Sequence, residues 1–125
     1  MNKKFLFCLT LVLICTALLI SCGSSSPKIP SWLQGTWTCA DSGEKAVFTA
    51  DNFILYDRWN NEEANISNLI TEAKEEGCKV GVKNSTSGDI YTLTLINKDN
   101  NMKQDFSFTK VSDSTFSFLG YEFSK

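Results

Sequence analysis

The residues able to do chemistry are few and of limited kinds. The 125-residue chain contains 14 acidic and 12 basic residues, five cysteines and no histidine. Without histidine, Ser-His-Asp and Cys-His catalysis and histidine-ligated zinc sites are excluded. The single arginine, Arg58, removes most schemes in which guanidinium groups clamp a phosphate or carboxylate. We therefore expect no enzymatic activity, no catalytic residue, no metal site and no cofactor.

The acidic residues occur in short runs without a partner base. Glu62-Glu63 and a later group ending at Glu76 have the pattern of a solvated helix face. The run at Asp99 lacks the length and the closing glutamate of a calcium-binding loop. The net charge of −2 includes no basic cluster, which argues against nucleic acid as a partner.

The cysteines divide by position. Cys8, Cys15 and Cys22 lie within or at the end of an N-terminal apolar segment, which leaves Cys39 and Cys78 in the folded part. An even number of cysteines in an oxidising compartment favours a disulfide, and both residues have the strand parity of core-facing neighbours. We expect a Cys39–Cys78 bridge, with two buried free thiols as the alternative.

The N-terminal segment has the pattern of a secretory signal. Lys3 and Lys4 precede an apolar stretch over residues 5–20, shorter than the ~20 residues that a membrane-spanning helix needs. Residues 19–22, Leu-Ile-Ser-Cys, resemble the lipobox of bacterial lipoproteins. The resemblance implies cleavage before Cys22 and acylation of its thiol, and two or more acyl chains anchor stably. An uncleaved membrane helix is the alternative.

This arrangement predicts three segments: a signal peptide over 1–21, a lipidated Cys22 with a flexible tether over 22–30, and a folded domain over 31–125. The tether is rich in glycine, serine and proline, which is typical of flexible linkers. The lipoprotein resemblance implies a location in the cell envelope. No acidic residue follows Cys22 closely, which favours the outer membrane of a double-membrane bacterium.

Most of the folded part predicts strands. Short alternating runs separated by turn residues occur over 31–56 and again over 78–123. We count about seven or eight strands, which indicates a small antiparallel β-barrel because nearly every strand has one polar face. The parity of the apolar residues changes at Gly120, which predicts a bulge or bend there.

One helix interrupts the strands. Ile66, Ile70 and Ala73 recur at helical spacing with polar residues between them, which predicts an amphipathic helix near 62–76. Asn60 or Asn61 would cap its start, and a glycine at position 77 would stop it.

Gly35-Thr36-Trp37 resembles the Gly-x-Trp motif of the first lipocalin strand, whose tryptophan closes the barrel floor. With Trp32 it forms the Trp-x-x-Gly-x-Trp segment of small lipocalin-like domains in bacterial lipoproteins. The family's arginine that stacks on this tryptophan is absent, and Lys110 and Lys125 are the available cations. The resemblance implies an interior that takes a small apolar ligand, with the lining candidates Trp37, Phe48, Leu93, Phe106 and Phe118.

Two loops are candidates for contact with a protein partner. Ser87-Gly88-Asp89-Ile90-Tyr91 resembles the Ser-Gly-x-x-Tyr segment of membrane-bound lysozyme inhibitors, which implies that Ser87 and Tyr91 frame an inhibitory loop. Arg58-Trp59 lies in a polar loop, where Trp59 either contacts a partner or covers the barrel mouth.

Two functions follow from these patterns. The first is a membrane-anchored extracytoplasmic lipoprotein whose barrel binds a small apolar ligand. The second is a protein-binding module of the cell envelope: an adhesin, a complex subunit or a lysozyme-type inhibitor. The first requires an interior cavity of roughly 300 Å³ or more. The second requires a filled interior and exposed aromatic side chains.

Overall fold

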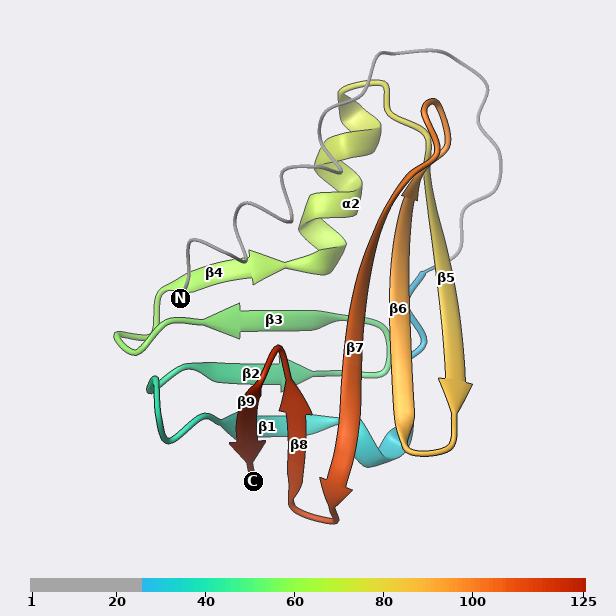
Figure 1. Cartoon of the computed structure of the whole chain (residues 1–125). Helices are drawn as coiled ribbons and strands as arrows, with labels where there is room; N and C mark the ends of the chain where they lie inside the picture. Colours follow the sequence, from blue (N-terminus) through green and yellow to red (C-terminus); the bar gives the residue numbers. More distant parts are fainter. Residues whose placement is uncertain (1–25) are drawn as a thin grey trace.

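The structure, a computed structural model, describes residues 26–125, which form an antiparallel β-sheet and one α-helix (Figure 1). The expected signal peptide over 1–21, the acylation of Cys22 and the tether residues 23–25 lie outside the described residues. Within residues 26–125, no helix has the length and apolar character to cross a membrane.

The strands form two meanders joined through the helix. The 3₁₀ turn η1 (Ser31–Leu33) precedes the first meander, which comprises β1 (Gly35–Thr38), β2 (Lys45–Phe48), β3 (Phe53–Tyr56) and β4 (Glu62–Asn65). The helix α2 (Ile66–Glu75) follows. The second meander comprises β5 (Val80–Ser87), β6 (Ile90–Asn97), β7 (Met102–Ser112), β8 (Thr115–Phe118) and β9 (Tyr121–Ser124). The strand order in the sheet is β4-β3-β2-β1-β9-β8-β7-β6-β5.

The sheet curls into a half-barrel. The first meander crosses behind the second in Figure 1, and β1 and β9 join them through the pair Thr38↔Ser124. The helix α2 lies beside the opening between the edge strands and contacts β3, β4 and β5. The expected mainly antiparallel β fold with one helix is therefore confirmed. The described residues contain nine strands instead of seven or eight, and β4 and β5 are the two edges of the sheet.

Strand alternation places the core as the sequence predicts. In β6, Tyr91, Leu93 and Leu95 are fully buried. In β7, Phe106 and Phe108 are buried between more exposed neighbours. Because every strand turns one face inward, the side chains of both meanders meet in one hydrophobic core.

The helix begins later than its periodicity predicts. Residues Glu62–Asn65 instead form β4, which pairs with β3 through Leu55↔Ala64. Asn65, rather than Asn60 or Asn61, is the N-cap, and its side chain accepts the backbone N–H of Asn68. The helical spacing of residues 66–75 extends back into residues 62–65. Pairing with β3 nevertheless makes residues 62–65 a strand. The predicted stop is confirmed, because Gly77 follows the helix with a φ of 93°.

The expected bulge near Gly120 is a complete hairpin turn. Leu119 and Gly120 have φ values of 54° and 82°, as a two-residue type I′ turn requires. The turn reverses the chain between β8 and β9, with Phe118 paired to Tyr121. The parity change in the sequence therefore marks two strands where one bent strand was predicted.

The predicted Cys39–Cys78 disulfide is not formed, because Cys39 is a free and fully buried thiol. Cys39 directly follows β1, whereas Cys78 lies between α2 and β5. Four strands separate β1 from β5 in the sheet. Both side chains face the core as predicted, but a shared face does not bring them within bonding distance.

The described part of the expected tether is ordered. Ile29 is buried, and its N–H donates to Ala50 O at 2.9 Å. The Asn84 side chain of β5 accepts the Lys28 N–H at 2.8 Å and donates to Ser26 O at 3.2 Å. Residues 26–30 thus belong to the fold, in contrast to the flexible linker that their composition predicts.

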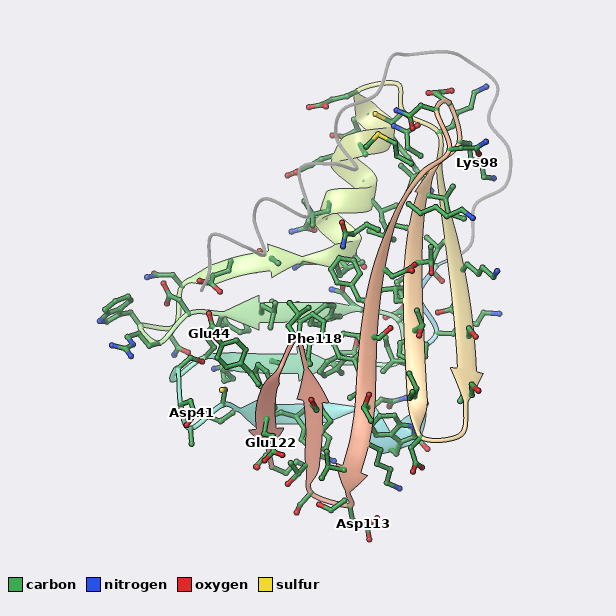
Figure 2. All side chains as sticks on the ribbon, in the orientation of Figure 1. Asp41, Glu44, Lys98, Asp113, Phe118 and Glu122 are labelled. Atoms are coloured by element: carbon green, nitrogen blue, oxygen red, sulfur yellow. The ribbon has the colours of Figure 1, made fainter. Side chains whose placement is uncertain are left out.

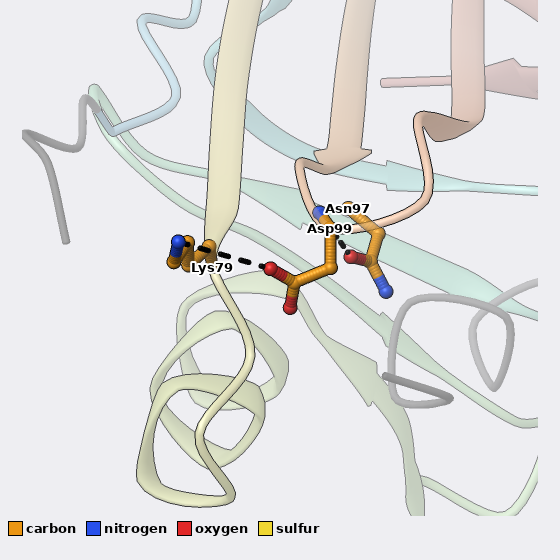
Figure 3. Close-up of polar contacts among 3 residues, drawn as sticks. All are labelled: Lys79, Asn97 and Asp99. Carbon is orange, nitrogen blue, oxygen red and sulfur yellow. Dashed lines mark hydrogen bonds and ion pairs between the residues drawn. The ribbon is translucent and has the colours of Figure 1, made fainter. Parts of the chain in front are cut away.

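Polar contacts fix the β6–β7 turn against the residues between α2 and β5 (Figure 3). Lys79 Nζ lies 4.0 Å from Asp99 Oδ1, and the buried Asn97 side chain accepts the Asp99 N–H at 3.0 Å. The backbone adds a bond from Lys98 N to Lys79 O at 2.9 Å. This turn is therefore fixed against the start of β5.

Candidate functional site

The residues predicted to line a ligand cavity are all in the core. Trp37, Phe48, Leu93, Phe106 and Phe118 are each at most 3% exposed. Figure 2 shows Phe118 projecting over the inner side of β2 and β3. These residues converge from both meanders, as the barrel hypothesis requires.

The aromatic rings of the core pack directly against one another. Phe108 lies at the centre, with ring centroids 5.2 Å from Phe48 and from Phe53, 4.6 Å from Phe118 and 5.9 Å from Phe116. Stacked and edge-to-face rings at such distances are in contact. The rings therefore occupy the region in which an apolar ligand was expected.

Trp37 is buried and fixed by contacts on several sides. Its Nε1–H donates to Leu33 O at 2.8 Å, and its ring meets Phe116 edge-on at 4.8 Å. Lys125 Nζ lies 4.7 Å from the Trp37 ring centroid, in a cation–π contact. Lys125 is therefore the cation that covers Trp37. Lys110, the other cation considered, lies 6.0 Å from the Trp32 ring instead.

Two glutamates form a carboxyl pair at one end of the half-barrel. Glu44 is 2% exposed, and its carboxyl group lies within hydrogen-bond reach of that of Glu63. One buried oxygen on each, Glu44 Oε2 and Glu63 Oε1, has no hydrogen-bond donor from the protein. A carboxyl group that carries a proton can donate it to the neighbouring carboxylate. Ser42 Oγ donates to the other oxygen of Glu44 at 3.3 Å.

Burial and mutual repulsion keep this pair partly protonated. Burial, followed by the charges of Glu44 and Asp57, raises the pKa of Glu63 to about 7. Burial also raises the pKa of Glu44, against hydrogen bonds from Ser42 and Glu63 that lower it. Two carboxylates this close cannot both ionise freely at neutral pH. Glu44 is buried and Glu63 is half-buried, so the pair can exchange its proton with solvent on the Glu63 side.

The sequence pattern predicts a solvated helix face for Glu62-Glu63, and Glu44 is not among the predicted site residues. The sequence does indicate that Glu44 is buried, because Glu44 has the same parity as Ala46 and Phe48, which face the core. Glu63 belongs to β4, next to the irregular register between Leu55 and Tyr56. Only the strand assignment of this segment reveals that the two carboxyl groups meet.

The β3–β4 turn presents Trp59 to solvent. The Asp57 carboxylate accepts the N–H groups of Trp59 and Asn61 at 2.9 and 2.8 Å, which fixes the turn. These backbone bonds, and above all that from Asn61, lower the pKa of Asp57. Trp59 is 70% exposed, the highest value among the exposed large hydrophobic side chains of residues 26–125. It does not cover the barrel interior.

Ser87 and Tyr91, which were expected to frame a partner-binding loop, differ in exposure. Ser87 is exposed at the end of β5, whereas Tyr91 is fully buried. The Tyr91 hydroxyl donates to Asn84 Oδ1 at 2.6 Å, and burial raises the pKa of Tyr91 to about 12. The prediction that Tyr91 contacts a partner is therefore wrong, because an inward-facing strand position holds it in the core.

Comparison with models of protein families, with curated proteins and with solved structures finds no match to this chain. Within residues 26–125, no group of three or more histidine, cysteine or acidic side chains is placed to hold a metal ion.

Proposed function

We propose that this protein is a lipid-anchored, extracytoplasmic module of the bacterial cell envelope that binds another protein through its β3–β4 turn. The lipobox ending at Cys22 supports the anchor and the compartment. The observation that carries the binding function is the exposure of Trp59 on a turn fixed by Asp57. The direct packing of the aromatic rings in the interior favours this function over an internal apolar ligand.

The chemistry of the turn suits protein recognition. Tryptophan and arginine are the residues most enriched among side chains that dominate binding energy. The Arg58 guanidinium lies 5.5 Å from the Trp59 ring centroid, and its Nε donates to Ser42 O at 3.4 Å. The Arg58 contacts link the β3–β4 turn to the β1–β2 turn, so binding immobilises few additional side chains.

The surroundings of Trp59 indicate the character of the partner. The two linked turns and the strand that follows carry exposed acids at Asp41 and Glu62 besides the Asp57 carboxylate. Arg58 is the exposed cation among them. We propose a partner surface with an apolar pocket for Trp59 and basic groups around it, because complementary charge speeds association and selects partners.

A photo-crosslinking amino acid at position 59 tests this function in intact cells. The matched control places the same amino acid at Leu119, a 58% exposed residue on the β8–β9 turn. We expect a discrete protein adduct from position 59 that is absent from position 119. Adducts of equal yield and identity at both positions, or none at position 59, would contradict the proposal.

Native mass spectrometry of the secreted domain, before and after denaturation, tests the ligand alternative. Mass lost on denaturation would identify an apolar ligand and would overturn the protein-binding function if position 59 also gives no adduct. A separate mass measurement on the N-terminal peptide tests the anchor. We expect the acyl mass on Cys22 and its loss, with release from the membrane, in Cys22→Ala.

A further inference from the structure

A groove lies where the ordered segment 26–30 meets the helix. It has a volume of about 420 Å³ and is open to solvent. Lys28 and Lys74 line it, one from the N-terminal segment and one from the last turn of α2. We call it the Lys28–Lys74 groove. Its remaining lining consists of Ser26, Ser67 and Thr71 with the apolar Pro27 and Ile70.

The two lysines of this groove are available to an external anion. Neither forms an ion pair with an acidic side chain among residues 26–125. The nearest acids along the helix, Glu72 and Glu75, are exposed and do not line the groove. Two ammonium groups beside three hydroxyl groups are suited to a phosphate ester, which accepts hydrogen bonds and carries negative charge.

The position of the groove relative to the anchor selects the source of that phosphate. Ser26 is held by the Asn84 side chain, so only residues 23–25 separate the packed fold from Cys22. A chain of that length spans at most about 14 Å. If Cys22 carries the lipid anchor, the groove therefore lies within reach of the headgroup layer.

We propose that the Lys28–Lys74 groove binds the anionic headgroup of a membrane phospholipid and so turns the side of the domain formed by α2 and β5 toward the bilayer. This inference rests on the proposed anchor at Cys22. A lysine close to an anionic membrane surface contributes roughly a fivefold gain in affinity. The two lysines together are therefore expected to contribute about 25-fold.

Lysine footprinting on the anchored protein tests the groove. The acylated chain is placed in vesicles of phosphatidylglycerol or of phosphatidylcholine, and acetylation rates of individual lysines are followed by mass spectrometry. We expect Lys28 and Lys74 to react at least about fivefold more slowly on phosphatidylglycerol. The exposed Lys103 of β7 serves as the internal control and is expected to react equally on both. Equal rates for Lys28 and Lys74 on both lipids would overturn the proposal.

A charge placed in the groove separates specific from general attraction. Thr71→Glu adds a carboxylate to the lining, whereas Asn68→Glu adds the same charge to an exposed position of α2 outside it. We expect protection of Lys28 and Lys74 to be lost in the first variant and kept in the second. Protection that survives Thr71→Glu would overturn the groove as the binding site.

Two further measurements complete the test. One distinguishes lipid phosphate from free phosphate, and the other distinguishes a missing anchor from a groove that does not bind lipid. Inorganic phosphate added to phosphatidylcholine vesicles is expected to give no protection, and protection by it alone would overturn the lipid assignment. The acyl mass on Cys22 is verified before footprinting. Its absence would overturn the anchor and the inference with it, whereas its presence without protection would overturn the groove alone.

Discussion

Replacing Glu63 by glutamine is expected to remove a specific pH dependence of stability. The pKa of Glu63 is about 7 in the folded protein, against an ordinary value of 4.5. Between these values the folded state binds more protons than the unfolded chain, so the free energy of unfolding falls as pH rises from 4.5 to 7. The destabilisation is complete above pH 7 and absent below 4.5.

The magnitude follows from the difference between the two pKa values. That difference corresponds to about 3 kcal/mol as an upper limit. Glu63 retains contact with solvent, and the screening this allows reduces the expected effect to about 1–2 kcal/mol. Glu63→Gln keeps a donor for Glu44 without adding charge. We expect the variant to match the wild type at pH 4.5 and to be more stable by about 1–2 kcal/mol at pH 8.

Urea unfolding at half-unit pH steps measures this difference. Glu62→Gln is the matched control, because it removes the same charge from an exposed neighbour and is expected to leave the slope unchanged. Glu44→Gln removes the charge that faces Glu63, so the transition should move to lower pH. Parallel stability curves for Glu63→Gln and the wild type from pH 4.5 to 8 would refute the proton-sharing pair.

Three further substitutions test the aromatic core, the contact of Lys125 with Trp37, and the ordered N-terminal segment. Phe108→Ala leaves a cavity among five aromatic contacts and is expected to cost about 3–5 kcal/mol in urea unfolding, well above the cost of Phe108→Leu. Lys125→Ala should cost about 0.5–1 kcal/mol, whereas Lys125→Arg, which still covers Trp37, should retain stability in thermal unfolding. Asn84→Ala leaves the buried Tyr91 hydroxyl without its acceptor and should cost about 1–3 kcal/mol. Asn84→Ala should also speed amide exchange of residue 28 relative to Asn84→Asp. Unchanged exchange would contradict the inference that the Asn84 side chain holds the N-terminal segment.

Strand parity was readable from the sequence because each strand has one buried and one exposed face. Tyr91, Leu93 and Phe108 have core positions in the structure as their alternation predicts. The antiparallel β fold was predicted from the same alternation, because nearly every strand has one apolar face that must pack against the apolar face of other strands. The lysine over Trp37 was also identified among two candidates, although only the structure distinguishes Lys125 from Lys110.

Partnerships between segments depend on tertiary structure, because they join positions that no local pattern relates. Glu62–Asn65 follows the pairing preference of β3 over its own helical spacing. Cys39 remains a free thiol because strand order, which parity does not contain, separates β1 from β5.

The same limit applies to the two polar sites. Glu44 meets Glu63 across different hairpins, and Asn84 orders residues 26–30 against the composition of that segment. Local sequence patterns determined the strands and the core. Contacts between distant residues decided the proton-sharing pair and the groove, because both depend on how the curled sheet brings its edges and turns together.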